Sequence, residues 1–148
     1  MIWILLPDHT CVLTPVMKEF IVEVYRVHSR DDFNRGPYRY CHPLIDKHCD
    51  DRSRWPPIYE DYDEKPDLRV KIWYNKPYPV SFCFTTLEQF LEWFGEDLEV
   101  LHEYDQVLSI IEVPEIEVVR GLKQAFFYQN THTKIVETLE LTELYSLV

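Results

Sequence analysis

The chain has 148 residues, of which 46% are hydrophobic and 15% aromatic, and its formal net charge is −11. This composition supports a packed core, and the scarcity of glycine argues against a Gly-rich phosphate loop. No apolar run reaches the ~20 residues of a membrane-spanning helix. We expect one α+β domain over residues 1–148. We also expect a cytoplasmic protein (in the host cytoplasm, if viral), since four cysteines without a recognisable leader favour reduced thiols.

The negative charge is concentrated in the C-terminal half. Residues 80–148 contain 13 acidic and three basic residues, whereas residues 1–35 have a net charge of −1 and residues 36–79 are neutral. An acidic surface repels nucleic acid and membrane headgroups and attracts basic proteins. We therefore expect a basic protein partner, and neither direct binding to nucleic acid nor association with a membrane.

Two elements are predicted before residue 29. The apolar run at residues 2–6 predicts a strand. Pro15 follows Thr14 as in many helix starts, and apolar residues then recur with helical spacing, so a helix is expected over about 15–28. The β-branched residues of this range leave a strand as the alternative.

Residues 29–68 lack hydrophobic periodicity and are rich in proline and tyrosine. Because proline removes a backbone donor and fixes φ, neither a long helix nor a central strand is expected there. A structureless loop of this length is unusual in a compact domain. We therefore predict an irregular insertion or binding arm that a metal, aromatic packing or a partner must order.

The strongest local prediction is a helix over 86–95. Thr85 with Glu88 has the pattern of a capping box, and Gly95 could end the helix in the left-handed conformation. The expected fold is α+β, mainly an antiparallel sheet with two helices. The remaining strands are predicted at residues 69–74, 80–84, 106–113, 115–121 and 124–130, and residues 134–148 fit a strand slightly better than a helix.

The segment Cys41–Cys49, with the sequence CHPLIDKHC, contains two thiols and two imidazoles. These groups are a sufficient ligand set for tetrahedral zinc. However, Cys41 is adjacent to His42 and His48 to Cys49, and adjacent side chains of an extended segment point to opposite faces. A zinc-stapled domain whose Cys41-His42 and His48-Cys49 pairs could carry hydrolytic activity is therefore the alternative function, not the leading one.

Three further interpretations of this segment remain open. A zinc site could combine three of its residues with His28 or Cys11. A disulfide could join Cys41 to Cys49, although a reducing compartment opposes it. The favoured interpretation treats the thiols as small buried apolar groups and the imidazoles as surface or capping groups.

A row of carboxylates lies on the predicted helix, because Glu88, Glu92 and Glu96 are four residues apart. Like charges at this spacing destabilise a helix by roughly 0.2–0.5 kcal/mol per pair, and the helix contains no lysine or arginine. Such rule-breaking is expected where function outweighs stability, although a solvated face is the simpler alternative. The predicted binding residues are Glu88, Glu92, Trp93, Glu96, Asp97, Glu99 and Glu103.

These patterns predict a small, acidic, non-enzymatic binding protein. It would inhibit a basic, nucleic-acid-binding partner by occluding the partner's site with carboxylates spaced like phosphates. The expected style is that of phage anti-restriction, anti-CRISPR or toxin-immunity proteins, although no matched residues connect the chain to them. No catalytic residue and no cofactor is predicted, apart from zinc in the alternative, and no motif assigns the chain to a family.

Overall fold

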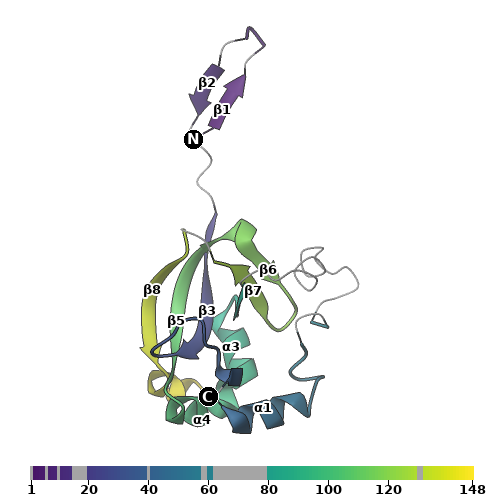
Figure 1. The fold of residues 1–148 in the computed structure, drawn as a ribbon, viewed down its shortest axis with the longest axis vertical. Helices are drawn as coiled ribbons and strands as arrows, with labels where there is room; N and C mark the ends of the chain where they lie inside the picture. Colours follow the sequence, from purple (N-terminus) through teal and green to yellow (C-terminus); the bar gives the residue numbers. More distant parts are fainter. Residues whose placement is uncertain are drawn as a thin grey trace.

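The computed structural model describes residues 2–5, 7–9, 11–14, 20–39, 41–57, 60–61, 80–129 and 132–148. Within these ranges the chain forms two three-stranded antiparallel sheets, with helices at one end of them (Figure 1). The predicted α+β class with antiparallel pairing is confirmed. Strands β1 (Ile2–Leu5) and β2 (Cys11–Thr14) form a separate antiparallel hairpin.

The first sheet has the strand order β3-β5-β8. Its strands are β3 (Ile21–Ser29), β5 (Gln106–Pro114) and β8 (Lys134–Glu140). The central strand β5 pairs with β3 along its whole length. The prediction of a strand at 106–113 is therefore confirmed.

The helix predicted over 15–28 is wrong in its described part, because residues 21–29 form β3. Residues 15–19 lie outside the described residues. The β-branched side chains that left a strand open fit the pleated surface, and pairing along all of β5 outweighs the helical spacing.

The second sheet has the order β4-β7-β6, with β4 (Val80–Cys83), β7 (Ala125–Tyr128) and β6 (Val118–Arg120). A 3-10 turn, η3 (Glu115–Glu117), connects β5 to β6. The predicted strands at 80–84, 115–121 and 124–130 are thus confirmed with shorter bounds. The prediction at 69–74 lies outside the described residues.

The predicted helix at 86–95 is confirmed as α3 (Leu87–Phe94), with two differences at its ends. Thr86, one residue later than predicted, is the N-cap, and its side chain accepts a hydrogen bond from the Gln89 backbone N–H. Gly95 has a right-handed φ of −58°, so the chain does not turn there. It continues through η2 (Gly95–Asp97) into α4 (Leu98–Glu103), and the left-handed residue is Asp105, with φ 56°.

The segment 134–148 combines both structures that its pattern allowed. After strand β8 it forms a 3-10 helix, η4 (Leu141–Leu147). Leu141 and Leu144 are buried in the main core, and in a 3-10 helix residues three apart lie on the same side. A reciprocal capping box between Glu140 and Glu143 fixes the start of this turn.

The segment predicted to be irregular, 29–68, contains regular structure in its described part. It forms a 3-10 turn, η1 (Pro37–Arg39), and the helix α1 (His42–Cys49). Pro43 lies in the first turn of α1, where its missing N–H is not needed. The prediction overlooked a helical stripe, because Cys41, Leu44 and His48, at i, i+3 and i+7, are all buried.

The main core lies where these helices meet the lower part of the sheets. Phe90, Leu101, Leu108 and Leu141 have no exposed surface and come from α3, α4, β5 and η4. A second cluster fills the space between the two sheets and includes Val24, Ile111, Val113 and Phe127. The helix α3 is therefore held on one side by the main core, which leaves its other side available for contacts.

Gly121 marks a close approach of two chain segments. A Cβ atom at Gly121 would overlap the backbone carbonyl and the carboxylate of Asp61, which is buried. The Asp61 carboxylate accepts hydrogen bonds from the backbone N–H groups of Lys123 and Gln124. These contacts tie residue 61 to the turn between β6 and β7.

We predict that Gly121→Ala lowers the free energy of unfolding by about 1–3 kcal/mol, because the added methyl group displaces the Asp61 carboxylate from its donors. Gly36→Ala is the matched control, since no atom lies within 4 Å of its added Cβ. This control should leave stability unchanged or raise it by up to about 1 kcal/mol. Urea unfolding measures both changes, and equal values for the two variants would contradict the prediction.

Candidate functional site

A buried histidine links α1 to the turn after α3. His48, at the end of α1, places its Nε2 3.0 Å from Oδ2 of Asp97 in η2. Its Nδ1 lies 2.6 Å from the hydroxyl of Tyr38, which in turn accepts a 2.6 Å hydrogen bond from Nε1 of Trp93. Lys47 completes the group, because its Nζ lies 2.7 Å from Oδ1 of Asp97.

Aromatic stacking adds to these polar contacts. The ring of Trp55 lies flat on His48, with centroids 4.0 Å apart and planes 8° apart. Its Nε1 donates to the Trp93 carbonyl at 2.9 Å. The Arg54 guanidinium lies 4.4 Å above the Trp55 ring and pairs with Glu96 at 2.8 Å. We call these residues the His48 cluster: Tyr38, Lys47, His48, Arg54, Trp55, Trp93, Glu96 and Asp97.

The hydrogen bonds of the cluster form a chain from Trp93 to Asp97. Burial raises the pKa of Tyr38, so its hydroxyl keeps its proton; it accepts a hydrogen bond from Trp93 and forms a second one with Nδ1 of His48. The Nε2–H of His48 then donates to Asp97. Burial by itself would raise the pKa of Asp97, but the hydrogen bonds from His48 and Lys47 outweigh it and lower the pKa. Asp97 is therefore a buried carboxylate with donors at both oxygens.

The four residues predicted as zinc ligands do not converge on one point. Cys41 and His48 are buried, whereas His42 and Cys49 are exposed. Both ring nitrogens of His48 already have partners. Among the described residues, no group of three His, Cys, Asp or Glu side chains could hold a metal ion.

The structure also bears on the other interpretations of the segment Cys41–Cys49. Cys41 precedes α1 and Cys49 is its last residue, and both are free thiols. A helix of this length separates them by about 12 Å, beyond the ~7 Å limit for a disulfide. Burial raises the pKa of Cys41 to about 11, so its thiol stays protonated and is a poor nucleophile. The second expected zinc partner, His28, is buried with hydrogen bonds at both nitrogens, and the side chain of Cys11 lies outside the description.

The structure divides the predicted binding residues into two groups. Trp93 and Asp97 are buried in the His48 cluster, and Glu96 pairs with both Lys47 and Arg54. The other four, Glu88, Glu92, Glu99 and Glu103, are exposed and form no ion pair within the described ranges. The α3 helix contains no lysine or arginine. Glu96, in the turn η2 that follows it, is offset by Lys47 and Arg54.

Sequence reasoning missed the residues that hold Trp93 and Asp97 in place. Tyr38, Lys47, Arg54 and Trp55 all come from the segment predicted to be irregular. The helical stripe of α1 was the available signal, since it places His48 on the buried face. No local pattern specifies that Asp97, 49 residues away, is its partner.

Fold and site together define a small acidic α+β protein whose proline-rich segment is anchored by a buried His–Asp pair and tryptophan stacking. The chain belongs to the family described as Bacteriophage T4 Y00F protein, whose model matches residues 17–142. This membership places it among phage proteins. Comparisons with curated proteins and with solved structures each found no match. Within the described part of the chain, no helix is long and apolar enough to cross a bilayer.

We predict that Asp97→Asn lowers the free energy of unfolding by about 1–3 kcal/mol at neutral pH, because His48 and Lys47 lose a charged acceptor. The lowered pKa of Asp97 means that the carboxylate stabilises the fold fully above its unfolded pKa of about 3.9, and less as the pH falls through its folded pKa. The wild type should therefore lose more stability than the variant below about pH 4.

Glu99→Gln is the matched control, since it makes the same chemical change at an exposed carboxylate two residues away. It should change stability by less than about 0.5 kcal/mol. Urea unfolding at several pH values measures both variants. The same pH dependence in the Asp97→Asn variant and in the wild type would contradict the assigned role of Asp97.

We also predict that a chelator leaves the thermal midpoint of the purified protein unchanged. The reason is that the thiols and imidazoles of residues 41–49 are split between the buried and exposed sides of α1. Thermal melts with and without EDTA, together with elemental analysis, measure this. Stoichiometric zinc, accompanied by a lower midpoint after chelation, would restore the zinc-stapled alternative.

Proposed function

We propose that this protein is a non-enzymatic phage inhibitor that binds a basic, nucleic-acid-binding host protein and occludes its site. The observation that carries the proposal is the set of four exposed carboxylates on α3 and α4, which we call the acidic helix surface: Glu88, Glu92, Glu99 and Glu103. None of them has an ion pair in the part of the chain that is described.

The spacing of these carboxylates suits a nucleic-acid mimic. Glu88 and Glu92 are one helical turn apart on α3, and Glu99 and Glu103 are one turn apart on α4. One turn corresponds to about 5–6 Å between neighbouring side chains, which is comparable to the spacing of phosphates along a strand. A groove lined with lysine and arginine could therefore accept this surface in place of its nucleic acid.

The His48 cluster supports the proposal by fixing α3 from its other side. Trp93 and Asp97 are held by side chains of residues 38–55, and Phe90 is fully buried in the main core. A helix fixed in this way presents its carboxylates without further ordering, which lowers the entropic cost of binding. In this proposal the buried Trp93 and Asp97 support the acidic helix surface from within the fold.

The distribution of charge supports a salt-sensitive mode of binding. The C-terminal half has a net charge of −10, from 13 acidic and three basic residues. Such a field steers a basic partner and accelerates association, and salt screens it. Membership in a phage family supports the viral origin of the protein. An anti-defence role in the host cytoplasm is the part that we propose.

We predict that Glu88→Lys/Glu92→Lys weakens binding to the partner at least about tenfold, because two carboxylates of the surface become repulsive to a basic groove. The matched control is Glu117→Lys/Glu137→Lys, which changes the net charge equally but lies in η3 and β8. The partner is first isolated from host lysate on immobilised wild-type protein and then purified for titration.

The same titration is repeated at 50 mM and 500 mM salt and with competing duplex DNA. The proposal requires a loss of affinity in the first variant but not in the control, weakening by salt, and displacement by DNA. Equal affinities of both variants, or binding that DNA leaves untouched, would show that the acidic helix surface does not occlude a nucleic-acid site.

A further inference from the structure

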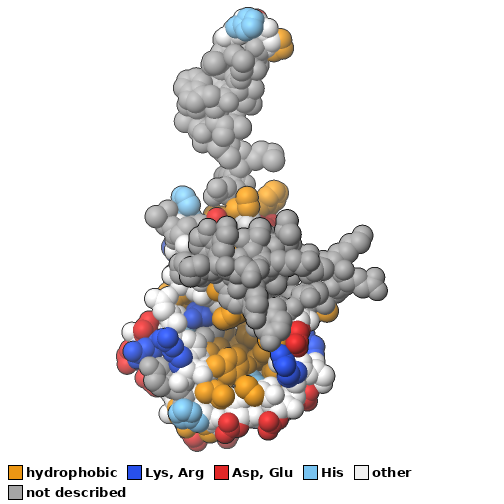
Figure 2. Space-filling view, turned by 45° about the vertical axis from the view of Figure 1, so that its right-hand side comes forward, with side chains coloured by type: hydrophobic (Ala, Val, Ile, Leu, Met, Phe, Trp, Pro, Cys, Tyr) orange, Lys and Arg blue, Asp and Glu red, His pale blue; other side chains and the backbone are white. Residues whose placement is uncertain are grey.

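A cavity of about 950 Å³ lies outside the acidic helix surface. It opens beside the edges of β3 and β4, and Figure 2 shows hydrophobic side chains in a hollow flanked by lysine or arginine side chains. This volume is at the upper end of the range typical of small-molecule sites. The described aromatic side chains that line it include Tyr38, Trp55, Phe82, Phe84, Trp93 and Phe94.

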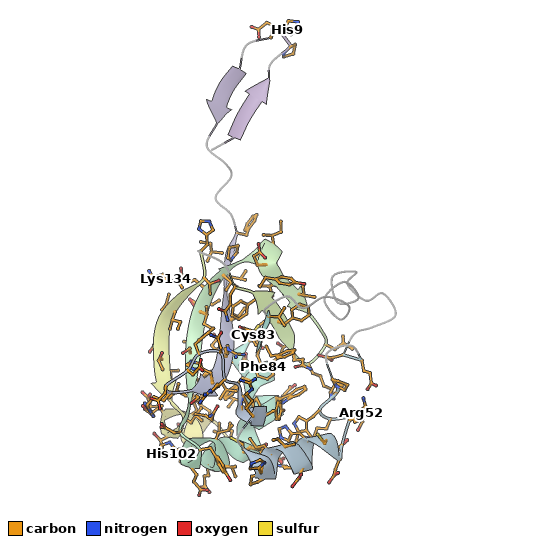
Figure 3. All side chains as sticks on the ribbon, in the orientation of Figure 1. His9, Arg52, Cys83, Phe84, His102 and Lys134 are labelled. Atoms are coloured by element: carbon orange, nitrogen blue, oxygen red, sulfur yellow. The ribbon has the colours of Figure 1, made fainter. Side chains whose placement is uncertain are left out.

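The topology explains why a cavity forms at this place. Among the described residues, one bridge joins the two sheets, in which Tyr25 and Phe84 exchange two backbone hydrogen bonds of 2.8 Å. Phe84 lies in the middle of the body (Figure 3). Next to this bridge, the contact between the two strands is made by a side chain: Nη1 of Arg26 donates a 2.7 Å hydrogen bond to the backbone carbonyl of Phe82. The diverging edges leave a space that η1, α1 and α3 border.

The wall of this cavity contains a buried positive charge. Arg26 is only 5% exposed and lines the cavity. Its Nε donates to the Phe33 carbonyl, but no carboxylate forms an ion pair with it among the residues the structure describes. Burial lowers the pKa of Arg26 to about 10, so the guanidinium remains charged at neutral pH. A buried cation is costly to desolvate, and the electrostatic attraction of Asp32 and the Phe33 ring 5.2 Å away compensate only part of that cost.

We propose that this cavity binds a small molecule with an aromatic body and one anionic group, which lies against the Arg26 guanidinium. A guanidinium offers paired donors to a carboxylate or a phosphate, and aromatic walls favour offset or edge contacts with a flat ring. Arg39, exposed and also lining the cavity, places a second positive charge near it. The inference is independent of the acidic helix surface and of any protein partner.

The test uses two fluorescent probes that differ mainly in charge. The first is 8-anilinonaphthalene-1-sulfonate, which is aromatic and anionic, and the second is N-phenyl-1-naphthylamine, its neutral analogue. We expect the folded wild-type protein to bind one equivalent of the anionic probe at least about tenfold more tightly than the neutral one. Binding that favours the neutral probe, or is not saturable, would overturn the proposal without any variant.

Two variants locate the site. Arg26→Gln removes the charge but keeps a donor for the Phe82 carbonyl. It should lower the affinity for the anionic probe about tenfold and leave the affinity for the neutral probe unchanged. Gly36→Phe should block both probes, because Gly36 lines the cavity and open space surrounds its Cβ position. Leu122→Phe is the control, since it adds a ring at an exposed position outside the cavity.

Circular dichroism establishes that each variant is folded. If Arg26→Gln does not fold, two other measurements test the cavity: the ratio of the wild-type affinities for the two probes, and the binding of both probes to Gly36→Phe. Full binding of both probes to Gly36→Phe would overturn the proposal. Indole-3-acetate and phenyl phosphate, added as competitors, distinguish a carboxylate site from a phosphate site. Displacement by decanoate but by neither of them would overturn the aromatic assignment.

Discussion

The contact between His48 and Asp97 is the interaction on which the arrangement of this protein depends. It joins a proline-rich segment, whose described residues contribute little to the sheets, to the turn between two helices of the main core. The helix α1 that carries His48 has eight residues and no side-chain cap, and isolated helices of that length are marginal in water. It is therefore the packing of its buried stripe, and not its own propensity, that maintains it.

Two consequences follow from this anchor. Trp93 on α3 and Asp97 in the following turn η2 are fixed, so that the carboxylates on the other side of α3 are presented on a rigid helix. Toward the sheets, Tyr38, Trp55 and Trp93 from the same cluster become walls of the apolar cavity. The acidic helix surface and the cavity have opposite electrostatic character, because the C-terminal half supplies the acids and the N-terminal segment supplies Arg26 and Arg39.

The predictions succeeded where a local pattern and the tertiary packing agree. The capped, strongly amphipathic helix at 86–95 and the strands after residue 106 were found from periodicity and turn residues. The prediction of a helix over 15–28 is wrong in its described part, because the β-branched residues with helical spacing pair with β5 along nine residues. The acidic row was found, but burial of Trp93 and Asp97 depends on residues 38–55, which no local pattern connects to α3.

The sequence by itself determined the α+β class, the principal helix, most of the described strands and the concentration of negative charge, since these depend on composition and short-range periodicity. Only the tertiary structure decided that residues 41–49 form a docked helix, that Glu96 is paired while four neighbouring carboxylates are free of ion pairs in the described chain, and that Arg26 borders a cavity. The physical reason is that burial and ion pairing are set by groups distant in sequence, whose meeting depends on how the two sheets and the helices pack together.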